Sequence, residues 1–298
     1  MKDFSGKIAV VTGGGSGIGR ALVQQLVAEG CSIAMCDISE DDMAETKSLA
    51  EAEATQGAKV ITCRADVGKE EEVNAFRDHV QAETGEDHIH LLFNNAGIGG
   101  GGSFVAGERS QWERTFNVCW YGVYYNCRAF LPMLVKASEG HLVNVSSVNG
   151  FWASIGPETP HTAYSAAKFA VKGFTEALLT DLRLNAPHVK ASVVMPGHIG
   201  TNIALNSFRE HGESALDPET SPEEARARGE FFRDHGLAPA EAAKIILDGV
   251  KAETWRILVG QDAQLLDAAV RTDPVAVYAP EFAATIFPNM GIEGDAPE

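Results

Sequence analysis

The stretch KIAVVTGGGSGIGRALVQQLVAE, residues 7–29, decides the fold of this chain. After the lysine, its first residues are apolar or β-branched and predict a short buried strand. Glycine-rich residues 12–19 follow, and a helical pattern then runs from Ile18 to Glu29. A glycine run alone could form a mere turn. Its place between a strand and a helix favours a phosphate-binding loop, because glycines let the backbone approach a phosphate and the helix N-terminus supplies amide donors.

The glycine spacing differs from the common G-x-G-x-x-G pattern. Gly13, Gly17 and Gly19 give T-G-x-x-x-G-x-G instead. The next expected strand, residues 32–36, ends at Asp37, which lies 18 residues past Gly19. This offset is close to the ~20 residues at which an acid contacts the ribose hydroxyls of NAD.

Asp37 has a second interpretation, because it could simply begin a turn before the helix expected from Glu40, with Ser39 as the N-cap. Under the first interpretation, its neighbours indicate which dinucleotide would bind. No Arg or Lys occurs between Asp37 and Thr46 to meet a 2′-phosphate. An acid without a nearby base therefore favours NAD over NADP.

Strand and helix patterns alternate along the rest of the chain. This alternation predicts an α/β fold, a doubly wound parallel sheet with helices on both faces. We expect seven strands in a single domain over residues 1–260, with an insertion at about 202–237 and a C-terminal extension over 261–298. The further strands are expected at Lys59–Cys63, Ile89–Phe93, His141–Val145, Val189–Met195 and Arg256–Val259, and the further helices at Lys69–Glu83, Trp112–Val135, Thr162–Leu184, from Pro239, and at Asp262–Arg271.

Polar side chains stand just past four of the expected strand ends, namely Asp37, Asn95, Ser147 and Thr201. Because the carboxyl ends of parallel strands meet at one edge of the sheet, the chemistry should gather there. Tyr164 and Lys168 share one face of an expected helix. Such a pair is often only a surface pair, but an ammonium within ~4–6 Å favours the phenolate and makes a tyrosine usable as an acid or base. Ser147 could then donate a hydrogen bond to a substrate oxygen.

The chain has 298 residues and a net charge of −17, from 41 acidic and 24 basic residues. This charge argues against a nucleic-acid or anionic membrane surface, which needs basic patches. The five cysteines are scattered without a C-x-x-C pair, so we expect reduced thiols in a cytoplasmic protein and neither a disulfide framework nor a zinc site. The polar N-terminus gives no sign of a signal peptide, and no apolar run approaches the ~18 residues of a membrane span.

With these motifs, the chain resembles the short-chain dehydrogenase/reductase family of Rossmann-fold, NAD(P)-binding oxidoreductases. The likeness covers roughly residues 5–260 and rests on TGGGSGIG at 12–19, Asp66-Val67, NNAG at 94–97, Ser147, YSAAK at 164–168 and PGHIGT at 196–201. The resemblance implies hydride transfer between a nicotinamide and a carbinol carbon, no metal, and a homotetramer or homodimer formed through the two long helices.

The resemblance also implies a role for each site residue. Tyr164 would be the acid/base, Lys168 would lower the tyrosine pKa and hold the nicotinamide ribose, and Ser147 would bind the substrate oxygen. The implied cofactor contacts are Gly13, Gly17, Ile18 and Gly19 at the pyrophosphate, Asp37 at the adenosine ribose, Asp66 and Val67 at the adenine, Asn95, Ala96 and Gly97 beside the cofactor, and Ile199 and Thr201 at the nicotinamide end.

One position departs from the family pattern. The family has an Asn in the helix after NNAG that links the lysine to solvent through a water, and Cys119 stands there in this chain. Asn117 lies two residues earlier, about 200° round an α-helix, and a thiol is a weak hydrogen-bond partner. The proton relay is therefore in question. Slower turnover, a rerouted water and an altered protein are all open, as is a plain cysteine on an apolar helix.

The loop after Ser147 and the insertion, which in the family covers the substrate, should form the pocket. Aromatic residues in both suggest a bulky apolar alcohol or ketone, although each could equally belong to the core. With Ser147 and Tyr164, we expect Asn149 and Trp152 to contact the substrate, and the further candidates are Phe151, Phe208, Phe231, Phe232 and His161, the last expected to be structural. The extension could cover a neighbour's substrate site or pack on the surface.

Three functional hypotheses remain. The first is an NAD-dependent dehydrogenase or reductase of secondary alcohols or ketones. The second is a cofactor-binding sensor or scaffold with little catalysis, which only Cys119 supports. The third keeps the enzyme but gives it a preference for NADP.

Overall fold

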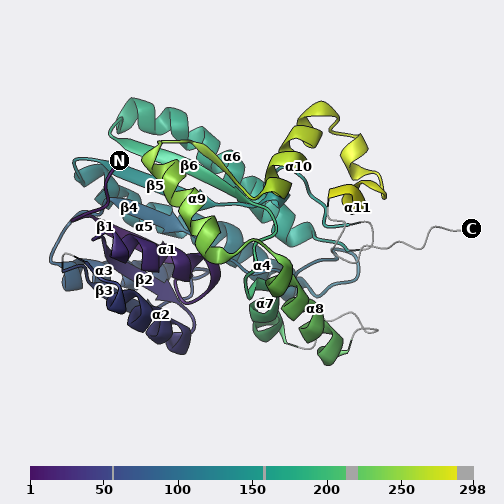
Figure 1. Cartoon of the computed structure of the whole chain (residues 1–298), viewed down its shortest axis with the longest axis horizontal. Coiled ribbons are helices and arrows are strands. Elements are labelled where there is room, and N and C mark those ends of the chain that lie inside the picture. Colours follow the sequence, from purple (N-terminus) through teal and green to yellow (C-terminus); the bar gives the residue numbers. More distant parts are fainter. Residues whose placement is uncertain (56, 157–158, 213–220, 287–298) are drawn as a thin grey trace, which may run out of the picture.

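The computed structural model describes residues 1–55, 57–156, 159–212 and 221–286. At the centre of the molecule is a sheet of seven parallel strands in the order β3-β2-β1-β4-β5-β6-β7 (Figure 1). The strands are β1 (Ile8–Thr12), β2 (Ser32–Asp37), β3 (Val60–Arg64), β4 (Leu91–Asn94), β5 (Gly140–Val145), β6 (Val189–Pro196) and β7 (Arg256–Val259). The expected fold class is confirmed, because every expected strand is present and all pair in parallel.

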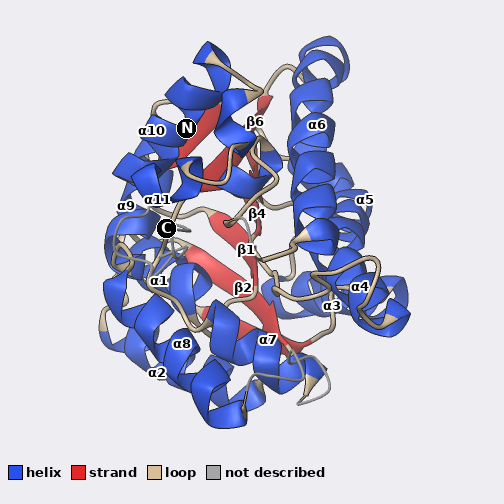
Figure 2. Ribbon diagram, turned by 90° about the vertical axis from the view of Figure 1, so that its right-hand side faces the viewer, coloured by secondary structure: helices blue, strands red, loops and turns tan. Residues whose placement is uncertain are grey.

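Helices cover both faces of the sheet (Figure 2). One face carries α1 (Gly17–Ala28), α2 (Glu40–Ala52) and α9 (Pro239–Lys251), and the other carries α3 (Glu70–Thr84), α4 (Arg109–Phe116), α5 (Gly122–Lys136) and α6 (Thr162–Asn185). Side chains of β1 alternate between the two apolar cores, with Val11 in the core beneath α1 and Val10 in the core beneath α5. Burial on both faces explains why the strands are continuous apolar runs.

The sheet changes its direction of winding between β1 and β4. From β1 the chain moves outward to β2 and β3, then returns to β4 and continues the other way. Such a switch point leaves a crevice outside the carboxyl ends of the strands. Beside it, Asn95 Nδ2 donates to the carbonyl oxygens of Thr12 at 3.0 Å and Gly13 at 3.2 Å, and Thr12 Oγ1 accepts from the amides of Asn95 and Ala96. These bonds hold the ends of β1 and β4 together.

The single helix expected at Trp112–Val135 is wrong in one respect. The chain passes from α4 through a π-helical turn, Asn117–Tyr121, into α5. The thiol of Cys119 donates to the carbonyl oxygen of Ile98 at 3.2 Å, so this turn is bonded to the glycine-rich loop beside it. A π turn is wider than an α-helical turn, and the angle of 200° expected between Asn117 and Cys119 therefore does not apply.

The insertion contains two helices that its sequence did not reveal, α7 (Ile203–His211) and α8 (Pro222–His235). A capping box begins α8, because Ser221 Oγ accepts from the amide of Glu224 and the Glu224 carboxylate accepts from the amide of Ser221. Residues 213–220 of the insertion lie outside the described residues.

The C-terminal extension begins with α10 (Gln261–Thr272), the helix expected there. A 3-10 turn, Ala276–Tyr278, and the short helix α11 (Phe282–Ile286) follow, and residues 287–298 lie outside the described part. Among the helices that the structure describes, none is long and apolar enough to cross a membrane.

Candidate active site

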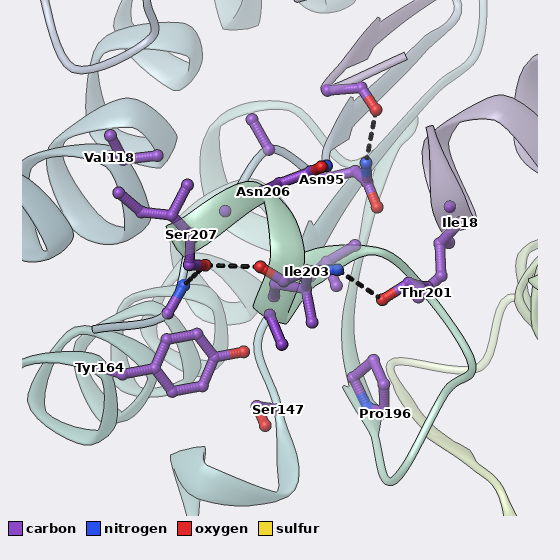
Figure 3. A pocket seen from close by; sticks show the side chains of 18 of the residues that line it. Ile18, Asn95, Val118, Ser147, Tyr164, Pro196, Thr201, Ile203, Asn206 and Ser207 are labelled. Carbon is purple, nitrogen blue, oxygen red and sulfur yellow. Dashed lines mark hydrogen bonds between the residues drawn. The ribbon is translucent and has the colours of Figure 1, made fainter. Parts of the chain in front are cut away.

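A cavity of about 510 Å³ lies in the crevice at the carboxyl ends of the strands (Figure 3). All but one of the residues expected to hold the cofactor, the substrate or the reacting groups line it. They are Gly13, Gly17, Ile18, Asp37, Asp66, Val67, Asn95, Ala96, Gly97, Ser147, Asn149, Trp152, Tyr164, Lys168, Ile199 and Thr201. Segments far apart in the sequence therefore meet around one space.

Gly19 is the exception, and it does not line the cavity. A Cβ built on Gly19 would lie 1.9 Å from the carbonyl oxygen of Gly13 and 2.7 Å from Nδ2 of Asn95. Gly19 thus lets α1 pack directly on the turn that precedes it. Gly13 and Gly17 have φ angles of +65° and +53°, which glycine adopts most readily. The turn needs glycine for its path, and the start of α1 needs it for close packing.

The N-terminus of α1 is open to the cavity. Its N-cap residue, Ser16, makes no side-chain capping bond, and the first turn of α1, all of it described, holds no acidic residue. The first amides and the positive end of the helix dipole are therefore free to bind an anion. Gly13, Ser16, Gly17 and Ile18 line the cavity here. This cradle fits the pyrophosphate of a dinucleotide.

Asp37 ends β2 and presents its carboxylate to the cavity. Its Oδ2 accepts from the amide of Gly15 at 2.9 Å and its Oδ1 from the amide of Ser39 at 3.1 Å. Burial raises the pKa of the Asp37 carboxyl, and these backbone hydrogen bonds oppose the rise. Ser39 is also the N-cap of α2, as the turn interpretation predicted. The same aspartate can shape the turn and accept hydrogen bonds from ribose hydroxyls.

Arg20 is the cation of α1, and its Nε and one of its terminal nitrogens donate hydrogen bonds within the chain. Its Nε donates to the Gly15 carbonyl at 3.0 Å and to Thr46 Oγ1 at 2.9 Å. Its terminal nitrogen donates to Gly15 again at 2.7 Å and pairs with Glu45 at 2.7 Å. These bonds hold Arg20 against the glycine turn and α2.

Ser147, Tyr164 and Lys168 come together in the cavity from two elements. Ser147 follows β5, while Tyr164 and Lys168 lie one turn apart on α6. Figure 3 shows the Tyr164 hydroxyl pointing into the cavity, on the side where Ser147 lies. Lys168 Nζ donates to the carbonyl oxygen of Val145 at 3.0 Å and lies 5.3 Å from the centroid of the Tyr164 ring. The hydroxyls of Ser147 and Tyr164 and the buried Nζ of Lys168 thus lie around one region of the cavity.

The pKa of Tyr164 shifts opposite to the sequence-based expectation. Burial raises it above the usual value for a phenol, and the neighbouring Ser147 hydroxyl opposes that rise only in part. Burial also lowers the pKa of the Lys168 ammonium. Loss of water is therefore the largest cause of both shifts, and both groups are shifted toward their neutral forms.

Cys119 is fully buried, as a core cysteine would be, yet it also borders the reacting groups. A Cβ built on Gly97 would lie 3.5 Å from Lys168 Nζ and 3.7 Å from Cys119 Sγ. The thiol proton points instead at the carbonyl oxygen of Ile98, at 3.2 Å. The departure from the family pattern therefore lies within the active site.

The helix α7 lines the cavity, within the insertion that was expected to form part of the pocket. Figure 3 shows Ile203, Asn206 and Ser207 of α7 facing the cavity. Asn206 Nδ2 donates to Ser16 Oγ at 3.3 Å, and Ser207 Oγ accepts from the amide of Gly99 at 2.6 Å. The helix therefore bridges both rims of the crevice. Its mixed polar sequence had no periodic apolar pattern to predict this position.

A chain of charges ties α7 to the expected adenine site. Arg114 donates from one terminal nitrogen to both carboxylate oxygens of Asp66, at 2.9 and 2.8 Å. Its Nε donates to Glu210 of α7 at 2.6 Å. We call Asp66, Arg114 and Glu210 the lid latch. Arg114 and Glu210 also line the cavity, and no sequence motif marked either of them.

The expected substrate contacts differ in how free they are. Asn149 lines the cavity, but its Nδ2 already donates to the carbonyl oxygens of Trp152 at 3.0 Å and Ser154 at 2.8 Å. Of the other candidates, Trp152, His161 and Phe232 line the cavity, whereas Phe151, Phe208 and Phe231 do not.

His161 packs on the acid/base candidate. Its ring centroid lies 4.7 Å from that of Tyr164. Burial lowers the pKa of His161 to about 4, so its imidazole is neutral at physiological pH. A neutral ring packed on the tyrosine agrees with the structural role expected for it.

Comparison with known proteins indicates one family. The model of the short chain dehydrogenases matches residues 7–212. SadH of Mycobacterium tuberculosis is 40% identical over 274 residues, 91% of this chain and 92% of SadH. Estradiol 17-beta-dehydrogenase 11 of Macaca fascicularis is 31% identical over 220 residues, 73% of this chain and 70% of that protein. The crystal structure of a short chain dehydrogenase/reductase from Burkholderia phymatum in complex with NAD has a TM-score of 0.79 and 30% identity, covering 94% of this chain and 98% of that one.

Proposed function

The chain belongs to the short-chain dehydrogenase family, and from this premise we propose that it is an NAD-dependent enzyme that transfers hydride between the nicotinamide and a secondary alcohol or ketone. The observation that carries the proposal is the convergence of Ser147, Tyr164 and Lys168 on a cavity that the glycine turn and Asp37 also line. The NAD-bound relative from Burkholderia phymatum supports the choice of a dinucleotide.

The reacting residues would divide the work by their hydrogen bonds. The hydroxyls of Ser147 and Tyr164 would both hydrogen-bond to the substrate oxygen in the cavity that these residues line. In oxidation the Tyr164 oxygen takes the alcohol proton, and in reduction it returns a proton to the developing alkoxide. The ammonium of Lys168, held by the Val145 carbonyl, favours negative charge on the tyrosine oxygen. The chemistry that bound NAD supplies is hydride transfer at the carbinol carbon.

Turnover of a panel of secondary alcohols with NAD, in the wild type and in Tyr164→Phe, tests this proposal. Loss of a positioned acid/base should reduce kcat by roughly 10²–10⁴-fold, while NADH binding, measured by fluorescence, stays within about threefold. Tyr124→Phe, at an exposed tyrosine of α5, is the matched control. Equal activity in Tyr164→Phe and the wild type would remove the tyrosine from the mechanism and overturn the proposal.

The proposed preference for NAD over NADP rests on the Asp37 carboxylate and on the hydrogen bonds of Arg20. A 2′-phosphate would lie against a buried carboxylate, and the nearest cation on α1 is already bonded to Gly15, Thr46 and Glu45. Asp37→Ala should narrow the ratio of kcat/KM for NAD to that for NADP by about tenfold or more. A wild type that prefers NADP would contradict this part of the proposal and leave the catalytic part intact.

A second candidate function rests on Cys119, which lies near Lys168 and whose thiol, among the described residues, donates to a loop carbonyl. The chain would then bind NAD as a sensor or scaffold with little catalysis. Tight NADH binding without turnover of any alcohol would favour it, especially if Cys119→Asn gained activity. Turnover in the wild type that Cys119→Asn does not raise would exclude it.

We propose a bulky apolar carbinol as the substrate. The cavity lining near Ser147 includes Val148, Trp152, Ile155 and Phe232, and these side chains would desolvate an apolar substituent. The relative named for estradiol, which is such an alcohol, supports this class. The five unpaired cysteines support a reducing, cytoplasmic location.

A further inference from the structure

The C-terminal extension packs on the loop that follows the catalytic serine candidate. The indole N–H of Trp152 donates to the carbonyl oxygen of Val277 at 2.8 Å, and the amide of Ala153 donates to the Tyr278 hydroxyl at 3.0 Å. The ring of Phe282 meets the Trp152 indole edge-on, with centroids 5.9 Å apart. Figure 1 shows α10 and α11, in yellow, together at one side of the molecule. The extension thus binds its own chain here.

These contacts form a separate apolar core. Trp152 is 1% exposed and packs with Val148, Ala263, Leu266, Val277 and Ala283. Apart from Val148 and Trp152, every buried member of this core belongs to the extension. The indole N–H, the one polar group of the Trp152 side chain, also has a hydrogen-bond partner, as a buried indole usually does. The extension therefore determines where the indole lies.

The same loop leads directly to the reacting groups. Asn149 Nδ2 donates to the carbonyl oxygens of Trp152 and Ser154, and the amide of Asn149 donates to Ser147 Oγ at 3.1 Å. Trp152 lines the cavity together with Ser147 and Tyr164. Trp152 is thus one of the residues that line the cavity, and the extension holds its indole in place.

We propose that residues 276–286 are a specificity-determining segment, which holds the Trp152 indole as a wall of the substrate pocket and so limits the size of the larger substituent on the carbinol carbon. The proposal rests on the proposed function for the identity of the substrate class. The contacts of Val277, Tyr278 and Phe282 with Trp152 and Ala153 would fix the indole in place. A fixed wall can exclude a larger ligand, whereas a wall that shifts cannot. In this role Trp152 contacts the substrate, whereas Tyr278 and Phe282 are positioning residues.

The first experiment changes the wall itself. Trp152→Ala and Trp152→Phe are compared with the wild type on a small secondary alcohol, 2-butanol, and on a large one, cyclohexylphenylmethanol. Removing the indole should raise the ratio of kcat/KM for the large alcohol to that for the small one by about tenfold or more, because pocket contacts discriminate by such factors. Trp152→Phe should lie between. An unchanged ratio in a folded Trp152→Ala variant would overturn the proposal.

The second experiment keeps Trp152 and changes the residues of the extension that contact it. Tyr278→Phe removes one hydroxyl, and Phe282→Ala removes the ring that packs on the indole. Both variants should raise the ratio of kcat/KM for the large alcohol to that for the small one by roughly threefold. The change should lie more in KM than in kcat. Leu265→Ala, on the exposed side of α10, should leave the ratio unchanged. Since Tyr278→Phe keeps the apolar packing, it remains informative if Phe282→Ala fails to fold.

A readout independent of turnover separates the two proposals. Acrylamide quenching of tryptophan fluorescence should increase in Tyr278→Phe and Phe282→Ala relative to Leu265→Ala. When Trp152→Phe is added to each of these variants, the increase should disappear, because Trp152 is its source. If the wild type turned over no alcohol, the proposed function would fail. The size ratio would then be taken from the dissociation constants of the two alcohols in the presence of NADH, and an unchanged ratio there would reject the segment's role.

Discussion

Tyr164 and Lys168 are both held toward their neutral forms. Burial raises the pKa of the Tyr164 phenol and lowers that of the Lys168 ammonium. In the proposed oxidation the tyrosine must be ionised to accept a proton, whereas in reduction it must be protonated to donate one. Because its pKa lies above the ordinary value of about 10, the ionised fraction is small near neutrality and increases as the pH rises.

The two directions of the reaction should therefore depend differently on pH. We expect kcat/KM for alcohol oxidation to increase steadily from about pH 7 to pH 10, and kcat/KM for ketone reduction to stay level over the same range. Initial rates at saturating NAD or NADH measure both profiles. Lys168→Met should move the oxidation profile to still higher pH. An oxidation rate that is already constant above pH 7 would show that the tyrosine pKa is not raised.

Gly19 allows a matched test of close packing. Gly19→Ala should lower the free energy of unfolding by roughly 1–3 kcal/mol, because the new methyl group would meet the Gly13 carbonyl. It should also weaken NADH binding, since α1 would have to move from the turn. Urea titration and NADH fluorescence measure the two effects.

Gly173→Ala is the control, because an added Cβ on this exposed position of α6 meets nothing within 4 Å. It should instead stabilise the protein by about 0.5–1 kcal/mol, the helix-propensity difference between the two residues. Equal effects of the two substitutions would contradict the packing role of Gly19.

Among the elements, α7 is the one whose position depends on charge. The lid latch joins it to the expected adenine site through Arg114, which is bonded to Asp66 and Glu210 at once. Glu210 and Arg114 are 22% and 25% exposed at their side chains, so their ion pair is partly shielded from water. A pair of this kind contributes more than a fully exposed one, but less than a buried one.

Glu210→Gln should therefore raise the KM for NAD by roughly three- to tenfold, which corresponds to about 1 kcal/mol of lost lid contact. The dissociation rate of NADH should increase by a similar factor. Glu230→Gln, in the exposed pair with Arg226 on α8, is the control and should change neither value. Stopped-flow displacement of NADH gives the rate, and an unaltered rate in Glu210→Gln would mean that the latch does not hold the lid.

The sequence predicted the sheet well, for a physical reason. Strands buried on both faces are continuous apolar runs, and turns such as residues 12–19 need glycine at fixed places. The π-helical turn at Asn117–Tyr121 has no such signature, because it follows from contacts with a separate loop. The latch could not be predicted either, since Arg114 and Glu210 are 96 residues apart and meet only in the folded chain.

On the scale of the whole molecule, an aromatic face runs along α4, the π-helical turn and α5. It comprises the side chains of Trp112, Phe116, Trp120, Tyr121, Tyr124 and Tyr125. Tyr121 and Tyr124 are 39% and 37% exposed. Exposed apolar patches of this kind often mark interfaces, and the face lies on the long helices through which we expect a homodimer or homotetramer to form.

Tyr124→Glu should therefore weaken self-association, because it would place a charge within an apolar interface. Light scattering after size exclusion should show a smaller species at micromolar concentration, with the unfolding temperature reduced as the assembly is lost. Phe231→Glu, on the exposed side of α8, should not change the mass. A wild type that is monomeric at all concentrations would rule out this interface.

Different parts of the chain form different walls of the cavity. Residues 13–118 supply the glycine turn, Asp37 and the latch residues Asp66 and Arg114, whereas residues 147–155, with the extension behind them, supply part of the proposed surroundings of the carbinol. Descendants of this protein can therefore exchange one alcohol for another by altering the loop after Ser147 and the extension, with the glycine turn and Asp37 inherited unchanged. Chimeras joined within β5 would be the natural way to move substrate preference between relatives.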